Sequence, residues 1–232
     1  PVVLSAGPSN SLSVISQHEL PLRISLGGGA FTSNTIPFTL LLLVPEVSSI
    51  SPTHGSLLGG TNVTVSGVGF AEAAAISSSV FVCRFGKTRS TVPGTYLAAR
   101  KAVLCVSPKV LSSGGVAIEI STNGGAEFTD SGVEFRYRSP VSLLSLFPLS
   151  GPDVGGTLIK IVGNHFYHDD SSEMKCRFDF SPVHILRTAR FVNQSLIECM
   201  APPSPNGPVA VSVMLTLNGI DYIPIGKGDS RF

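Results

Sequence analysis

Four cysteines are the residues of this sequence best suited to covalent chemistry. Cys83 and Cys105 lie 22 positions apart, and Cys176 and Cys199 lie 23 positions apart. Thiols spaced in this way can form disulfides, hold zinc, or stay free in the core of a protein from a reducing compartment. Zinc is the least favoured, because neither pair forms a Cys-x-x-Cys motif or stands near a set of histidines.

A second group of polar side chains could bind a metal. His165 and His168 are three positions apart, and Asp169 and Asp170 follow directly. Imidazole and carboxylate groups are ordinary zinc ligands, so these four residues are weak candidates for a metal site. The corresponding segment of the repeat described below, residues 71–79, has no histidine and a single carboxylate, Glu72. We therefore expect a solvated loop and no metal.

Signatures of the common enzyme classes are missing from the sequence. It has no Gly-x-Ser-x-Gly elbow, no Gly-Lys-Ser/Thr phosphate loop and no His-Glu-x-x-His motif. We therefore expect no catalytic residues, no cofactor and no enzymatic activity.

The composition narrows the fold class and the partners. Charged residues make up 13% of the 232 positions, which is too few for long surface helices, whose outer faces are charged. The formal net charge of +1 gives no reason to expect nucleic acid as a partner, because phosphate binding needs a basic face. No apolar stretch reaches the roughly 18 residues of a membrane span.

The sequence repeats itself with a period of about 96 residues. Gly59-Gly60-Thr61 recurs as Gly155-Gly156-Thr157, and the aromatic Phe70 recurs as Phe166. Long internal repeats of this kind indicate serial copies of one structural unit.

Each complete copy contains one pair of cysteines. Cys83-Arg-Phe returns as Cys176-Arg-Phe, and Cys105-x-x-Pro returns as Cys199-x-x-Pro. Of the three connectivities that four cysteines allow, the repeat selects Cys83–Cys105 and Cys176–Cys199. Free thiols in a reduced protein remain the main alternative.

The repeat also sets the expected domain boundaries. Residues 1–45 fit the C-terminal part of a first copy, and residues 46–138 fit a complete second copy. Residues 139–232 fit a third copy that stops before its last Phe-x-Tyr strand. We infer that the sequence is a fragment of a longer array.

Within each copy the hydrophobic pattern is typical of strands. Apolar residues alternate with small or polar ones, as at Val116, Ile118 and Ile120, and no window shows helical periodicity. Asn123-Gly124 and Asn218-Gly219 lie between apolar runs, which predicts type I′ hairpin turns. About seven short strands per copy predict an all-β chain of tandem immunoglobulin-like sandwiches. The short joins between copies favour a rod-like array.

The order of motifs resembles the IPT/TIG domain over nearly the whole sequence. A copy reads Pro-x-x-Gly-x-x-x-Gly-Gly-Thr, Gly-x-x-Phe, Cys-x-Phe-Gly, Cys-x-x-Pro and a closing Phe-x-Tyr. The third copy departs from it, with Asp179 in place of Gly86 and without the closing aromatic strand. The resemblance implies an immunoglobulin-like scaffold without catalytic residues, used by plexins, by fibrocystin-like receptors and by some transcription factors.

Two glycosylation sequons, at Asn62-Val-Thr64 and Asn193-Gln-Ser195, suit the same compartment as disulfides. We therefore expect a secreted or cell-surface glycoprotein whose partners are other protein chains, including copies of itself.

The first expectation for function is a structural or adhesive spacer, or a subunit of an extracellular filament or surface appendage such as a flagellar hair. The alternative is a plexin- or fibrocystin-like receptor ectodomain that binds a protein ligand. A second alternative is the IPT domain of an intracellular transcription factor.

Overall fold

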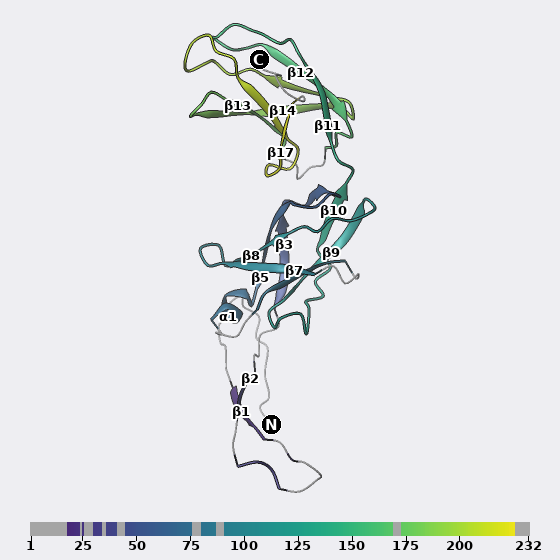
Figure 1. Cartoon of the computed structure of the whole chain (residues 1–232), viewed down its shortest axis with the longest axis vertical. Helices are drawn as coiled ribbons and strands as arrows, with labels where there is room; N and C mark the ends of the chain where they lie inside the picture. Colours follow the sequence, from purple (N-terminus) through teal and green to yellow (C-terminus); the bar gives the residue numbers. More distant parts are fainter. Residues whose placement is uncertain are drawn as a thin grey trace, which may run out of the picture. The chain divides into compact units, whose positions relative to one another are not determined.

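The computed structural model describes residues 18–23, 25, 30–33, 36–40, 45–75, 80–86, 91–168 and 173–225. Within these ranges the protein is all-β apart from one five-residue helix, so the predicted fold class is confirmed. The chain divides into two compact units, residues 1–45 and residues 46–232 (Figure 1).

The first unit contains one antiparallel pair of strands. β1 (His18–Leu22) pairs with β2 (Ile36–Leu40), with Leu20 opposite Phe38. The leucines after Leu40, residues 41–43, lie outside the described residues.

The second unit begins with the β3–β10 sandwich. Its hydrogen-bonded order is β3-β5-β8-β7-β6-β9-β10-β4, with the seventh strand, β10, parallel to β4. β7 pairs with β8 through one half and with β6 through the other, and so joins the two layers. The elements are β3 (Glu46–Ser51), β4 (His54–Ser56), β5 (Asn62–Val68), α1 (Phe70–Ala74), β6 (Val82–Phe85), β7 (Thr91–Leu97), β8 (Ala102–Val106), β9 (Gly114–Ser121) and β10 (Glu134–Arg138).

The β11–β17 sandwich follows in the same unit. Its order is β11-β12-β15-β14-β13-β16-β17, and here the long strand β14 belongs to both layers. The strands are β11 (Ser142–Phe147), β12 (Leu158–Asn164), β13 (Lys175–Asp179), β14 (His184–Asn193), β15 (Leu196–Met200), β16 (Ser212–Thr216) and β17 (Tyr222–Pro224).

Alternating apolar residues fill the space between the layers of each sandwich. Val63 and Val65 are fully buried in β5, and Ile159 and Ile161 are fully buried at the same places in β12. The intervening residues point outward, as a period of two requires. The repeat therefore specifies two separate cores of the same design.

The Gly-x-x-Phe motif that follows β5 and β12 has a packing reason. A Cβ on Gly67 would lie 2.8 Å from the ring of Phe70, and a Cβ on Gly163 would lie 2.5 Å from the ring of Phe166. Both rings are buried. The glycine is needed because the backbone carbonyl oxygen of the paired strand, Glu46 O or Ser142 O, lies nearest to that Cβ, and the phenylalanine ring lies close to it as well.

Helix α1 is an element that the sequence did not predict. It starts after Gly69, whose φ is 82°, and it buries Phe70 and Ala73. Five residues make little more than one helical turn. The segment is therefore too short to show a helical period.

The two Asn-Gly pairs form turns, and Asn218-Gly219 lies in the hairpin of β16 and β17, but the predicted type I′ geometry was wrong for both. That turn needs positive φ at both central residues, and only Gly124 and Gly219 have it, at 74° and 78°. The first pair lies in the segment that separates β9 from β10, residues 122–133. Side-chain bonds to the backbone, such as Ser121 Oγ accepting from Gly125 N at 2.9 Å, shape this longer loop.

The end of the third copy is described only as far as Ile225. Ile225 N donates to Val213 O at 3.3 Å, and β17 pairs antiparallel with β16 as β10 does with β9. Residues 226–232 lie outside the described residues. The expected lack of a closing strand, and the exact domain boundaries, stay predictions.

Candidate functional site

The disulfides connect the two layers of each sandwich. Cys83 in β6 bonds Cys105 in β8, with Cα atoms 6.1 Å apart. Cys176 in β13 bonds Cys199 in β15 across 6.4 Å. These are the two disulfides that the repeat indicates, and all four residues are buried.

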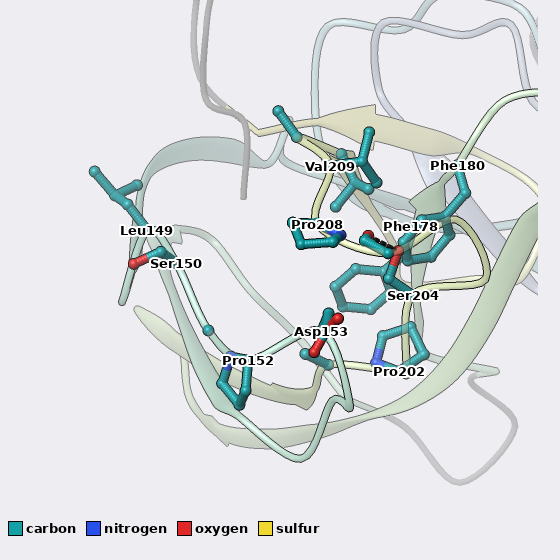
Figure 2. A pocket seen from close by; sticks show the side chains of 15 residues that line it. Leu149, Ser150, Pro152, Asp153, Phe178, Phe180, Pro202, Ser204, Pro208 and Val209 are labelled. Carbon is teal, nitrogen blue, oxygen red and sulfur yellow. Dashed lines mark hydrogen bonds between the residues drawn. The ribbon is translucent and has the colours of Figure 1, made fainter.

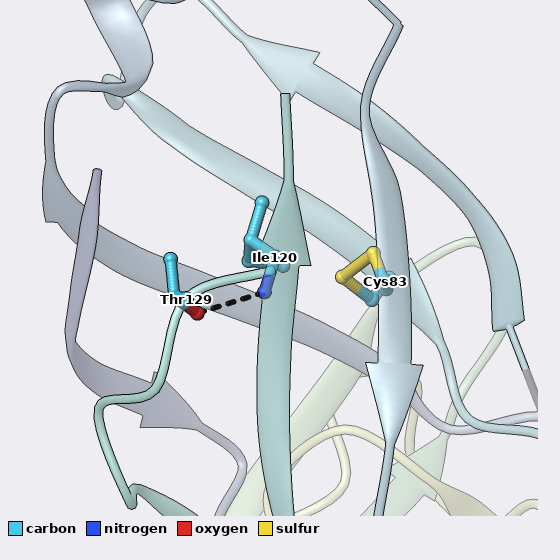
Figure 3. Close-up of a disulfide and its surroundings, with 4 residues drawn as sticks. Cys83, Ile120 and Thr129 are labelled. Atoms are coloured by element: carbon cyan, nitrogen blue, oxygen red, sulfur yellow. Dashed lines mark hydrogen bonds between the residues drawn. A yellow bond between two sulfur atoms is a disulfide. The ribbon is translucent and has the colours of Figure 1, made fainter. Parts of the chain in front are cut away.

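The surroundings of the first disulfide are tightly packed. Figure 3 shows Cys83 near Ile120, whose backbone N–H donates to Thr129 Oγ1 at 3.0 Å. Thr129 in turn donates to the buried carboxylate of Glu119 at 2.6 Å. A Cβ on Gly94 would lie 3.0 Å from Cys83 Sγ, so β7 passes close to the sulfur atoms. The disulfides therefore have a structural role in the core.

A junction of polar side chains joins the two sandwiches and is the candidate functional site. Thr61 Oγ1 donates a hydrogen bond to Asp221 Oδ2 at 2.6 Å. Asn218 Nδ2 donates to the same carboxylate oxygen at 2.9 Å and to His54 O at 3.2 Å. The Asp221 carboxylate thus accepts one bond from each sandwich, and Asn218 reaches across to the β4 backbone.

The loop between β16 and β17 positions these side chains. Asn218 Oδ1 accepts from the backbone N–H of Ile220 at 3.1 Å and of Asp221 at 2.8 Å. Such Asx turns fix the conformation of a short loop. The Asn218-Gly219 pair therefore predicted a turn. It did not predict the hydrogen bond that Asn218 makes with the other sandwich.

Aromatic contacts complete the junction. The ring of His54, which is 1% exposed, packs edge-on against Tyr167 with centroids 4.8 Å apart. The guanidinium of Arg138 lies 5.2 Å from the centre of the Tyr167 ring, a cation–π distance. No sequence motif marked His54, Tyr167 or Asp221, because these residues come together only when the sandwiches meet.

A groove at one end of the β11–β17 sandwich is the second candidate. It has a volume of about 540 Å³. Figure 2 shows Phe178, Pro202 and Pro208 around it, with Asp153 and Ser204 on its polar side. Pockets of this size hold small ligands or single side chains of a partner.

Two substitutions between the repeats account for the polar side of this groove. Ser204 N bonds Asp153 O at 2.7 Å, and Val110 N bonds Leu57 O at 2.9 Å, so the two pairs are equivalent. Leu57 and Val110 pack on the core of their sandwich. Asp153 and Ser204 cannot replace that apolar contact.

The histidine cluster is only partly described. His165 Nδ1 and the carbonyl oxygen of Pro140 are 3.1 Å apart. The ring of His168 lies 5.9 Å from that of Phe191. Asp169 and Asp170 lie outside the described residues, and within the described ones no group of three or more metal ligands gathers.

Both sequons lie at the surface. Asn62 is the exposed first residue of β5, and Asn193 is the exposed last residue of β14. The Asn193 side chain accepts a hydrogen bond from Ser195 N at 2.8 Å. Sugar on either asparagine stays a prediction.

Asp179, which stands where the second copy has Gly86, takes part in a local ion pair. Arg177 donates to both carboxylate oxygens of Asp179, at 2.8 and 3.0 Å. The hydrogen bond to Asp179 raises the pKa of the Arg177 guanidinium. The equivalent glycine, Gly86, instead has a φ of 77°.

Comparison with known proteins now decides the family. The IPT/TIG domain model matches residues 45–137 and again residues 141–223. The chain belongs to the IPT/TIG family. Mouse plexin-A2 is 32% identical over 185 residues, which cover 76% of this chain and 9% of that protein. Human fibrocystin-L is 26% identical over 203 residues, which cover 81% of this chain and 4% of that protein.

A solved structure supports the tandem arrangement of the fold. The full extracellular region of plexin A4 superposes with a TM-score of 0.51 at 16% identity, covering 87% of this chain and 17% of that one. The chain thus spans less than a tenth of the curated relatives named above and a small part of this structure. Among the described residues, no helix has the length and apolar character needed to cross a membrane.

Proposed function

We propose that this chain is a segment of a plexin-like receptor ectodomain, in which the junction holds two IPT/TIG sandwiches in a fixed relation. The observation that carries the proposal is the shared carboxylate of Asp221, bonded by Thr61 of one sandwich and Asn218 of the other. A linker between independent domains does not need such side-chain bonds.

The relatives favour the receptor alternative over the filament expectation. Plexins and fibrocystin-L are the curated proteins named above, and the solved structure is an extracellular region. The two disulfides support an oxidising compartment. The role of the chain in this proposal is non-catalytic: it spaces and orients the parts of a receptor that contact protein ligands.

Cell fractionation of the native protein tests this proposal against its two alternatives. A receptor predicts that an antibody to residues 46–225 stains intact cells and that mild detergent extracts the protein as a discrete species. Protection from external protease in intact cells would indicate the transcription-factor alternative. A detergent-insoluble polymer would indicate the filament alternative.

A further inference from the structure

The outer face of one layer of the β11–β17 sandwich is unusually apolar. We call the outward side chains of β11, β12, β15 and β14 the β12/β15 face. Phe147 is 69% exposed, Met200 49% and Leu158 45%. Leu144, Val162 and Val192 add further exposed apolar surface on the same strands. Clustered exposed apolar side chains of this kind mark interaction surfaces.

The equivalent face of the β3–β10 sandwich is more polar. Lys160 of β12 and Thr64 of β5 are 96 positions apart, so they are equivalent in the repeat. Phe147 lies opposite Lys160 and Ser51 lies opposite Thr64, so Phe147 and Ser51 are equivalent too. Leu158 lies opposite Met200, and Asn62 lies opposite Val106, so Leu158 corresponds to Asn62 and Met200 to Val106. Asn62 belongs to a sequon, so one repeat offers a glycan acceptor where the other offers leucine. The fold therefore does not require apolar residues at the positions of Phe147 and Leu158.

A row of charges crosses the centre of the β12/β15 face. Strand pairing places Phe147 beside Lys160, Lys160 beside Glu198, and Glu198 beside Arg190. Arg190 bonds Glu198 at 3.2 Å. The row therefore reads aromatic, positive, negative, positive across four strands, with apolar residues on both sides.

This row is complementary to itself. A twofold axis parallel to the strands, midway between β12 and β15, would reverse the strand order of a second copy laid on this face. Lys160 would then face Glu198 of the second copy, and Phe147 would face its Arg190. The first contact would be an ion pair and the second a cation–π contact, so no like charges would face each other. The rows containing Leu158 and Met200 would meet each other, apolar on apolar.

We propose that the β12/β15 face is a homodimer interface whose partner is the same face of a second copy of this chain. Each facing pair would occur twice across a closed twofold interface, Lys160 on Glu198 and Glu198 on Lys160, so the contact ends at a dimer and does not grow into a filament. The two sheets would pack face to face as in a sandwich core.

The size of the face sets the expected affinity. Four strands at ~4.8 Å spacing and about six residues at ~3.3 Å rise give a footprint of about 20 Å by 20 Å. That is about 400 Å² per copy, or about 800 Å² in total, which is below the standard size and in the range of weak, transient interfaces. We expect a dissociation constant on the order of micromolar. The inference is independent of the receptor assignment, since a purified chain can dimerise or stay monomeric in either case.

Sedimentation velocity of the full secreted chain from about 1 to 300 μM, a range chosen to bracket that affinity, tests the proposal. The expected result is a reversible monomer–dimer equilibrium. Leu158→Asn together with Lys160→Thr would place an Asn-x-Thr sequon where the other repeat has Asn62, and the added glycan should leave only monomer. A chain that stays monomeric throughout, or a glycosylated variant that dimerises like the wild type, would overturn the proposal.

Charge exchange gives a second test that does not rely on glycosylation. Lys160→Glu places a carboxylate at position 160 opposite Glu198 of the other copy. The two negative charges repel, and we expect at least a tenfold weaker dimer. Adding Glu198→Lys to the same chain restores opposite charges across the axis and should recover part of the affinity. No loss in the single variant, or no recovery in a double variant with unchanged circular dichroism, would contradict the twofold arrangement.

Discussion

The two sandwiches of the second unit share a buried disulfide and the alternating apolar residues of β5 and β12, and they differ around the equivalent residues Phe85 and Phe178. In the β3–β10 sandwich, strand β10 brings Phe135 and Tyr137 into the core, where the Phe135 ring packs edge-on against Phe85 at 5.5 Å. In the β11–β17 sandwich, Phe178 stands in place of Phe85 and lines a groove. The equivalent phenylalanine therefore packs against a second buried aromatic ring in one sandwich and borders a groove in the other.

The largest expected effect comes from removing an aromatic residue of β10. Phe135→Ala leaves a cavity in a fully buried position, and we expect the β3–β10 sandwich to lose about 3–5 kcal/mol of unfolding free energy. Urea unfolding followed by hydrogen exchange in each sandwich measures this separately. Phe135→Leu is the control with a smaller loss. Equal destabilisation of both sandwiches would contradict the assignment of two independent cores.

The disulfides should contribute equally to the two repeats. Cys83→Ser with Cys105→Ser, and Cys176→Ser with Cys199→Ser, each open a loop of nearly the same length. We expect a loss of about 3 kcal/mol in either sandwich, measured by denaturant unfolding. A loss confined to one sandwich would show that the other disulfide is not formed in the protein.

Filling the groove should make the β11–β17 sandwich more like its neighbour. Asp153→Leu with Ser204→Val introduces the side chains of Leu57 and Val110 at their equivalent places. We expect a gain of about 1 kcal/mol in the stability of that sandwich, as for other cavity-filling changes. The reverse change, Leu57→Asp, is the matched control and should destabilise the β3–β10 sandwich. A loss of stability in the filled variant would show that the two ends do not correspond.

The smallest effect is confined to alkaline pH. Burial raises the pKa of Tyr137 above the ordinary value of 10.0. A raised pKa in the folded state means that folding stability is intact below pH 10 and falls as the pH rises above it. Tyr137→Phe should flatten this fall in the β3–β10 sandwich, as seen in unfolding curves taken above pH 10. An unchanged pH dependence would assign the effect to another group.

The repeat made most of the fold predictable, because period-two alternation and paired cysteines are local signals. The strands around Ile118 and Ile120, and the disulfide at Cys83, could be read from the sequence alone. Helix α1 could not, because five residues show no period. The junction was also hidden, since Thr61 and Asp221 are 160 positions apart, and the Gly-Gly-Thr motif that contains Thr61 marks the repeat and not a contact with the other sandwich.

The outer face of β12 shows a second limit of prediction from sequence. Leu158 and Val162 looked like ordinary strand residues, because alternation reveals that one face is buried but not whether the other face meets water or a partner. Only the register with Met200 and Phe147 gathers them into one apolar surface. The comparison with Asn62 in the other repeat then shows that the surface is optional for the fold.

The most direct test of the account is the distance distribution between the two sandwiches in solution. Pulsed electron resonance between spin labels on unnatural amino acids at the exposed positions Leu111 and Val154 measures it. A fixed junction predicts one narrow distribution, which Asp221→Ala broadens and the control Asp153→Ala leaves narrow. A broad distribution in the wild-type chain, unchanged by Asp221→Ala, would contradict a fixed junction.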